Sequence, residues 1–291
     1  MKLKRRDGTM IERTDGQEKL LKILYGTVWG RMLLRPLTAP AVSEFAGKLL
    51  STRFSRILIN PFIRQNHIDM SQFEKRTYDS YNDFFSRKIR EGFRPVDMQP
   101  QHLISPCDSK LTVLPITEKM SFTLKHTRYC AASLLKNKKL ADEYAGGFVL
   151  IFRLSVEDYH RYIYVADGEK TENVRIPGVF HTVNPIANDY YPIYKENARE
   201  YSTLHTREFE DILMMEVGAL LVGKIVNHHE KAHVFRGQEK GYFQFGGSTV
   251  VLLLKKNTVR IDEDILKNSR QGVETIVRCG EKIGTAVSEI Y

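Results

Sequence analysis

The stretch Phe245-Gly246-Gly247-Ser248-Thr249 places a hydroxyl side chain directly after an unusually permissive backbone. Two consecutive glycines reach conformations that are closed to residues with a side chain. The apolar run from Val250 to Leu254 then predicts a buried strand. A serine held between these two features can be pressed against the carbonyl group that precedes it. Ser248 Oγ could therefore attack the Gly247 carbonyl carbon, and proximity would supply much of the rate.

This attack would replace an amide bond by an ester. Elimination and hydrolysis would then leave a pyruvoyl group at a new amino terminus formed from residue 248. The same four residues, Gly-Gly-Ser-Thr, are also typical of an ordinary loop that enters a core strand, which is the more frequent situation. The motif alone leaves both interpretations open.

A self-cleaving serine or a decarboxylase needs a proton carrier, and histidine suits that task near neutral pH. His160 lies just past the apolar run from Phe148 to Leu154 and is our candidate, although an isolated histidine is more often structural. Asp108, which follows Ser105-Pro106-Cys107, could orient a histidine or simply cap a turn.

The sequence offers no clear metal site or disulfide framework. Its three cysteines have no paired spacing, which fits a reducing compartment. His228 and His229 are adjacent, so on a strand they would face opposite sides, and with His233 they lack a well-spaced carboxylate. We interpret these three histidines as part of a solvated loop and predict no metal.

Composition and charge narrow the class of partner. The chain has 291 residues and a formal net charge of +9, which favours nucleic acid or an acidic membrane. No glycine-rich phosphate loop opens a helix, which argues against nucleotide chemistry. The amino terminus has no apolar core after its charges, so we expect no signal peptide. No apolar run is long enough to span a bilayer.

The amino-terminal region is basic, aromatic and helical in pattern. Residues 1–16 suggest a hairpin or arm, and apolar residues recur at helical spacing from Glu18 to Leu34. Further helices are predicted over Ala41 to Ser51 and Tyr78 to Ile89. An apolar face with cationic flanks suits an interfacial membrane helix. A helix packed on its own core shows the same stripe, so both interpretations stay open.

From Leu103 onward the pattern changes to short apolar runs divided by turn residues, which indicates a mostly antiparallel β domain. The clearest predicted strands are Leu111–Leu114, Phe148–Leu154, Val174–Ile176, Leu213–Val217, Leu220–Val226 and Val250–Leu254. Ala131 to Leu140 is the clear helix that we predict within this domain.

Taken together, these pieces resemble phosphatidylserine decarboxylase, a pyruvoyl-dependent enzyme of membrane surfaces. The matching motifs occur in the family's order over about residues 78 to 285. They are Tyr81-Asn-Asp-Phe-Phe-Ser-Arg87 with Arg94-Pro95, Ser105-Pro-Cys-Asp108, Phe152-Arg-Leu154 with Asp158-Tyr-His-Arg161, Thr182-Val-Asn-Pro185, Glu216-Val-Gly-Ala219 through Val222-Gly223, Gly237-Gln-Glu-Lys-Gly-Tyr-Phe243, Gly246-Gly-Ser-Thr249 and Gly280-Glu-Lys-Ile-Gly284.

We expect an α+β protein, in which the basic amphipathic pattern predicts a helical membrane-docking region over residues 1–95 and the resemblance implies a β-rich catalytic domain over 96–291. The resemblance also implies self-cleavage between Gly247 and Ser248 into a large subunit, 1–247, and a small subunit, 248–291. The pyruvoyl group from Ser248 would bind the substrate amine as a Schiff base and accept electrons as carbon dioxide leaves. Asp108 and His160 would form the proton relay, and no metal or diffusible cofactor would be needed.

Two departures from the family pattern stand out. Gly246 is a mild variant, since the family usually carries Leu-Gly-Ser-Thr. Many members also have a second histidine three residues after the first, drawn with the aspartate and serine in the self-cleavage triad, and that position is Ile163 here. Either His160 serves both steps or another histidine substitutes. His181 is our candidate, because the family commonly has an aromatic residue there.

The expected partners are an anionic phospholipid membrane and phosphatidylserine, with the protein peripheral on the cytoplasmic face of the cell membrane. We expect no nucleic-acid partner, and an oligomer is compatible with the sequence. Two alternatives stay open at this point. One is the same pyruvoyl chemistry on a free amino acid, and the other is an unprocessed relative that only binds acidic lipid.

Overall fold

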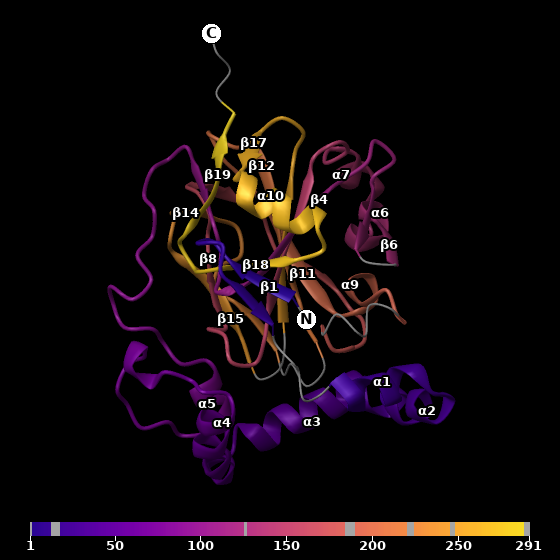
Figure 1. Cartoon of the computed structure of the whole chain (residues 1–291), viewed down its shortest axis with the longest axis vertical. Helices are drawn as coiled ribbons and strands as arrows, with labels where there is room; N and C mark the ends of the chain where they lie inside the picture. Colours follow the sequence, from indigo (N-terminus) through magenta and orange to yellow (C-terminus); the bar gives the residue numbers. More distant parts are fainter. Residues whose placement is uncertain are drawn as a thin grey trace.

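The computed structural model describes residues 2–12, 18–124, 127–183, 190–219, 224–244 and 248–287. The fold is α+β, as the sequence predicts, with α1 to α5 gathered at one end of a β-rich body (Figure 1). Several residues of the motifs and predicted strands lie outside the described residues, namely Asn184, Pro185, 220–223, Phe245, Gly246 and Gly247.

Two of the helices predicted in the amino-terminal region are divided or shortened, whereas the helix predicted over Ala41 to Ser51 is confirmed. The observed helices are α1 (Glu18–Gly26), α2 (Val28–Leu37), α3 (Pro40–Leu50), α4 (Ile59–Gln65) and α5 (Tyr81–Phe85), with 3-10 turns η1 (Arg53–Leu58) and η2 (Met70–Gln72). The predicted helix from Glu18 to Leu34 divides at Thr27, whose side chain caps α2 by accepting from the Gly30 amide at 3.0 Å. The helix predicted from Tyr78 to Ile89 is only α5, capped by Ser80.

A large mixed sheet forms the centre of the β-rich body. In spatial order its strands are β14 (Ala232–Val234), β9 (Gly168–Lys170), β11 (Arg199–His205), β12 (Asp211–Val217), β16 (Ser248–Leu254), β7 (Phe148–Leu154), β4 (Ser109–Pro115), β18 (Glu274–Val277), β1 (Lys2–Arg5) and β2 (Met10–Glu12), and β10 (Val174–Ile176) pairs with β11. Its pairings are antiparallel except for β1 with β18, which is parallel. The predicted amino-terminal hairpin therefore exists, and it extends this sheet.

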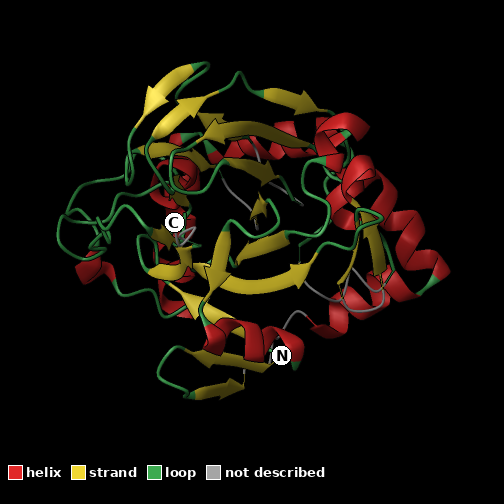
Figure 2. Cartoon of the chain, turned by 90° about the horizontal axis from the view of Figure 1, so that it is seen from above, coloured by secondary structure: helices red, strands yellow, loops and turns green. Residues whose placement is uncertain are grey.

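Smaller sheets and helices cover the large sheet (Figure 2). The small sheets are β13 (Ile225–Asn227) with β15 (Glu239–Phe243) and β8 (Arg161–Ile163), β17 (Val259–Ile261) with β19 (Lys282–Ala286) and β3 (His102–Ile104), and β5 (Ser121–Leu124) with β6 (Thr127–Cys130). The remaining helices are α6 (Ala131–Leu135), α7 (Lys138–Asp142), α9 (Ile193–Glu196) and α10 (Glu263–Arg270). The helix predicted from Ala131 to Leu140 is broken at Lys136, which has a φ of +54°.

The position of β16 within the sheet explains why its sequence is continuously apolar. Val250, Leu252 and Leu254 belong to one hydrophobic cluster, whereas Val251 and Leu253 belong to a second cluster on the other face of the sheet. A strand buried on both faces needs apolar side chains at every position. Since side chains alternate along a strand, Ser248 lies on the same face as Val250.

Candidate active site

Ser248 is the first residue of β16 and is completely buried. Its strand is paired on both sides, with β12 and with β7, and Ser248 itself lies opposite Leu154. The hydroxyl therefore has a fixed backbone behind it and an environment that excludes water. This is the rigid support that the sequence analysis expects for a serine that attacks its own chain.

His160 lies against this hydroxyl. Its Nδ1 is 3.2 Å from Ser248 Oγ, and its Nε2 is 3.0 Å from the carbonyl oxygen of Ser155. A carbonyl oxygen only accepts, so Nε2 must carry the proton and Nδ1 must present a lone pair to the serine hydroxyl. The structure thus brings together two of the predicted site residues in the geometry of a base and its nucleophile.

The surroundings keep His160 uncharged. The imidazole is fully buried, and its ring centroid is 4.2 Å from that of Phe85 in α5. Burial, together with the positive charge of Arg87, lowers the pKa of His160 to about 3. The Arg87 side chain is itself inaccessible to solvent, and its guanidinium lies 4.3 Å from the Phe73 ring centroid. A neutral imidazole is the form that can accept the serine proton.

The turn before His160 is held by several hydrogen bonds. The Ser155 carbonyl accepts from the Asp158 amide at 2.9 Å as well as from His160. The Ser155 amide donates to Asp158 Oδ2 at 2.6 Å, and Lys110 Nζ donates to the same carboxylate oxygen at 2.6 Å. Lys110 also contacts Glu157 Oε1 at 3.1 Å. These contacts fix the carbonyl that selects the tautomer of His160.

Asp108 does not contact His160 or Ser248 through any hydrogen bond of the described residues. Its carboxylate accepts from Arg94 Nε and Nη2, at 2.8 Å and 2.6 Å for the closest contacts, and from the Cys279 amide at 2.8 Å. In this structure the described partner of His160 Nε2 is the Ser155 carbonyl, and the relay between Asp108 and His160 stays a prediction. Asp108 joins the loop at Arg94 to the carboxy-terminal part of the chain.

His181 is also separate from the serine. Its Nδ1 is 3.4 Å from the Tyr25 hydroxyl, its ring stacks on Tyr191 with centroids 4.6 Å apart, and its Nε2 is 3.6 Å from Glu196 Oε2. Burial lowers the pKa of His181 to about 4. These contacts link the helical region to the β-rich body, and the described contacts of His181 include neither Ser248 nor His160.

Ile163, at the position of the family's second histidine, belongs to the hydrophobic core, and its amide donates to the Pro106 carbonyl at 2.9 Å. The three histidines that we assigned to a solvated loop have separate partners: His228 contacts Glu239, His229 contacts the Tyr164 hydroxyl, and His233 contacts Glu169. In the described part of the chain, no three potential metal ligands form a cluster.

A buried polar network lies on the same face of the sheet as Ser248. Glu216 is opposite Val250, and its Oε2 is 2.7 Å from Lys240 Nζ, with both side chains fully buried. Asn227 joins them, since its Oδ1 accepts from Lys240 at 3.0 Å and its Nδ2 donates to Glu216 at 3.1 Å. Tyr162, two residues after His160, donates to Asn227 Oδ1 at 3.2 Å. The network connects β12, β13, β15 and β8.

Sequence reasoning missed Ser155, Lys110 and Arg87. Ser155 acts through a backbone carbonyl, which leaves no signature in the side-chain sequence. Lys110 and Arg87 lie outside the predicted apolar strand runs and had no such signal, whereas a charged residue within an apolar strand run implies a buried partner. Arg153 in Phe148–Leu154 and Glu216 in Leu213–Val217 are two such cases.

A surface of a different kind lies on the helical region. Large apolar side chains there are exposed, including Trp29 by 77%, Phe54 by 87% and Ile57 by 78%. The exposed basic residues on the same segments are Arg35, Lys48, Arg53 and Arg56. We call these exposed apolar and basic side chains of α2, α3 and η1 the helical surface. The helices described here are too short or too polar to cross a bilayer.

Comparison with known proteins gives a consistent result. A family model described as phosphatidylserine decarboxylase matches residues 81–285. The chain is 48% identical over 266 residues to phosphatidylserine decarboxylase proenzyme 2 of Clostridium acetobutylicum, covering 91% of both chains. It is 40% identical over 280 residues to the phosphatidylserine decarboxylase proenzyme of Clostridium botulinum strain Langeland, covering 94% of this chain and 95% of the relative. The corresponding protein of Ruminiclostridium cellulolyticum is 38% identical over 278 residues.

Proposed function

Because the chain belongs to the phosphatidylserine decarboxylase family, we propose that it cleaves itself between Gly247 and Ser248, with His160 as the base. The protein is a lyase that decarboxylates phosphatidylserine to phosphatidylethanolamine, and it is made as a proenzyme. The observation that carries the proposal is the 3.2 Å contact between Ser248 Oγ and an uncharged His160 Nδ1.

The first step needs only the residues of this chain. His160 Nδ1 accepts the hydroxyl proton while Ser248 Oγ bonds to the Gly247 carbonyl carbon. The bond from that carbon to the Ser248 nitrogen breaks, the nitrogen takes up the proton, and an ester joins the two parts of the chain. The Ser155 carbonyl steadies Nε2–H while positive charge develops on the ring.

The second step breaks the ester. Loss of the Cα proton of residue 248 and cleavage of its Cβ–Oγ bond release Gly247 as a carboxylate and leave a dehydroalanine. Hydrolysis of its tautomer consumes one water, releases ammonia and leaves the pyruvoyl group. That group supplies a ketone that binds the substrate amine covalently and accepts electrons as carbon dioxide departs. The buried setting of Ser248 fits such a group, because it shields the ketone from bulk solvent.

The helical surface supports docking on an anionic membrane. Exposed apolar side chains flanked by exposed arginine and lysine suit the interface between acyl chains and acidic head groups. The net charge of +9 favours the same partner. Cys107, Cys130 and Cys279 are free thiols, which is consistent with the reducing side of the cell membrane. We therefore place the protein on the cytoplasmic face as a peripheral protein.

Denaturing electrophoresis and intact mass test the cleavage. The mature protein should yield a fragment of 291 − 248 + 1 = 44 residues, whose mass is lower than that of an amino-terminal serine fragment by one ammonia. Ser248→Ala should stay full length and release no carbon dioxide from phosphatidylserine. An uncleaved wild-type chain that binds acidic vesicles would instead identify a lipid-binding relative, and turnover of a free amino acid without lipid would identify the other substrate class.

A further inference from the structure

We propose that the ion pair between Arg153 and Glu274 is a positioning device for His160 that acts through Ser155. The inference rests on the proposed roles of Ser248 and His160, and it adds two residues, Arg153 and Glu274, that are not among the proposed catalytic groups. Arg153 lies on β7 in the large fragment, and Glu274 lies on β18 in the small fragment.

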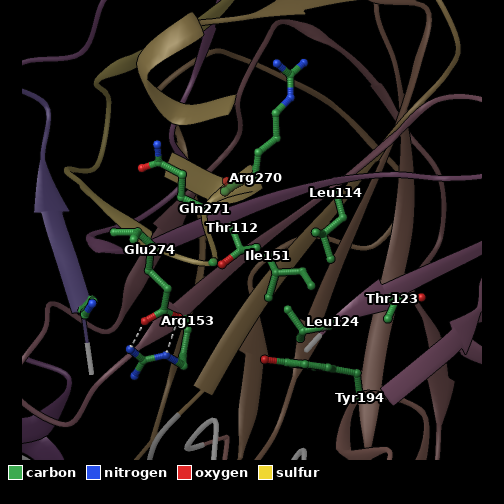
Figure 3. A pocket seen from close by; sticks show the side chains of 14 residues that line it. Thr112, Leu114, Thr123, Leu124, Ile151, Arg153, Tyr194, Arg270, Gln271 and Glu274 are labelled. Atoms are coloured by element: carbon green, nitrogen blue, oxygen red, sulfur yellow. Dashed lines mark hydrogen bonds and ion pairs between the residues drawn. The ribbon is translucent and has the colours of Figure 1, made fainter. Parts of the chain in front are cut away.

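The Arg153–Glu274 pair is bidentate and buried. Arg153 Nε donates to Glu274 Oε1 at 2.9 Å, and Nη2 donates to Oε2 at 2.6 Å, with side-chain exposures of 7% and 15%. The two strands are not neighbours, because β4 lies between them. The pair therefore reaches across one strand, at the wall of a cavity of about 390 Å³ (Figure 3).

Two hydrogen bonds connect the Arg153–Glu274 pair to His160, the proposed base. Arg153 Nη1 donates to Ser155 Oγ at 3.1 Å, and the carbonyl of the same serine accepts from His160 Nε2 at 3.0 Å. Glu274 holds the guanidinium by its other two nitrogens, so Nη1 has a fixed direction. Ser155 is thereby held by its hydroxyl, and the carbonyl that sets the tautomer of His160 keeps its place.

Stability alone does not account for this arrangement. A buried ion pair gives little net stability compared with two well-packed apolar side chains, and here a cavity borders the pair instead of close packing. Fixed geometry is a better explanation, because a small displacement of a catalytic group can lower a rate by about a hundredfold.

The chain offers a matched control for contacts that join the two fragments. Arg6 in the large fragment binds Asp264 Oδ2 at 2.6 Å and Asp262 Oδ2 at 2.8 Å in the small fragment. This cluster resembles the Arg153–Glu274 pair in charge and in crossing the cleavage point. It has no hydrogen bond to the turn of Ser155 among the described contacts.

The experiment compares Arg153→Met/Glu274→Leu with Ser155→Ala, Arg6→Gln and the wild type. Each variant is made as the full chain, and the rate of self-cleavage is followed by electrophoresis beside the melting temperature. The double variant removes both charges, so we expect it to fold and to melt near the wild type, yet to cleave about tenfold or more slowly. Ser155→Ala should show a similar slowing, and Arg6→Gln should cleave at the wild-type rate.

The pH profile separates positioning from support of the fold. The charged groups that face His160 are Arg87, Glu157, Lys110 and Asp158, and its pKa is lowered to about 3. A loosened turn admits water, so the pKa of His160 rises towards its ordinary value. The acid limb of the pH profile of the cleavage rate should then move to higher pH in the double variant. Glu274→Gln keeps the side-chain volume and should show the same shift, so it replaces the double variant if that protein does not fold.

The inference fails if the double variant cleaves at the wild-type rate with an unshifted acid limb. It also fails if Ser155→Ala is as fast as the wild type while the double variant is slow, or if Arg6→Gln is equally slow. His160→Gln tests the proposed function separately. If this variant cleaves at the wild-type rate, His160 is not the base, and the proposed function fails whatever the Arg153–Glu274 pair does.

Discussion

The helical surface and the surroundings of Ser248 depart from the usual distribution of side chains in opposite directions. On the helical surface, Trp29 and Phe54 are exposed by 77% and 87%, although they are large and apolar. Around Ser248, the charged side chains of Arg87, Lys240 and Glu216 are completely buried. Each departure costs free energy in water unless a second component compensates for it.

The difference between the two regions lies in what that second component is. Lys240 and Glu216 pair with each other, and Arg87 donates to the Glu157 and Asp158 carbonyls and lies over the Phe73 ring. The large apolar side chains of the helical surface are exposed in the described part of the chain, and we propose that their partner comes from outside it. The surroundings of Ser248 are thus compensated by contacts within the chain, whereas the apolar side chains of the helical surface are exposed, and we propose that they contact the membrane.

The strongest test of the buried region removes its base. His160→Gln should lower the rate of self-cleavage by about a hundredfold or more, because general base catalysis contributes about 10² to 10⁴. The protein should still fold, since glutamine can donate to the Ser155 carbonyl. Electrophoresis of the purified variant would show mostly the full-length chain. A variant that matures normally but fails to decarboxylate would confine His160 to the second reaction.

The next largest effect concerns protein stability and the buried network of Glu216, Lys240 and Asn227. Lys240→Met leaves the Glu216 carboxylate buried without its cation, so urea unfolding should show a loss of about 3 to 5 kcal/mol. The double variant Lys240→Met/Glu216→Leu removes both charges and should recover most of that loss. If the double variant is no more stable than the single one, the charges do not compensate each other as the geometry indicates.

On the helical surface, Phe54→Ser/Ile57→Ser should weaken binding to vesicles that contain phosphatidylglycerol by about tenfold or more. Each substitution removes apolar area worth about 1.5 to 3 kcal/mol when fully buried in an apolar phase. Sedimentation with vesicles measures the effect, and unfolding in urea should be unchanged. Phe235→Ser is the matched control, since Phe235 is 59% exposed but lies outside the helical region. Equal loss with that control would argue against a specific docking surface.

The smallest effect is expected at His181, which is buried yet separate from the serine. His181→Gln should mature at a rate within about twofold of the wild type, because its described contacts are with Tyr25, Tyr191 and Glu196 and no base step depends on them. A large decrease in self-cleavage, measured as for His160→Gln, would restore His181 as the substitute for the family's second histidine.

The sequence predicted well those features that depend on local patterns. Val250–Leu254 is continuously apolar, and the strand is buried on both faces. The position of Ser248 at its start and the nearby His160 followed from motifs. The partner of His160 could not be predicted, because Ser155 contributes a carbonyl that every residue has. The places of Asp108 and His181 depend on contacts with Cys279 and Tyr25, which are distant in sequence and which no spacing reveals.

The topology of the large sheet bears on whether folding precedes the proposed self-cleavage. The segment after Ser248 supplies β16, which is threaded between β12 and β7, and β18, which is threaded between β4 and β1. Adding a strand at such an interior position to a finished sheet would require the strands on its two sides to separate first. For the proposed cleavage before Ser248, we therefore expect the sheet to assemble before scission, and the cleaved carboxy-terminal segment to stay in place until the sheet unfolds. Two separately synthesised pieces would not be expected to reconstitute the enzyme by simple mixing of folded parts.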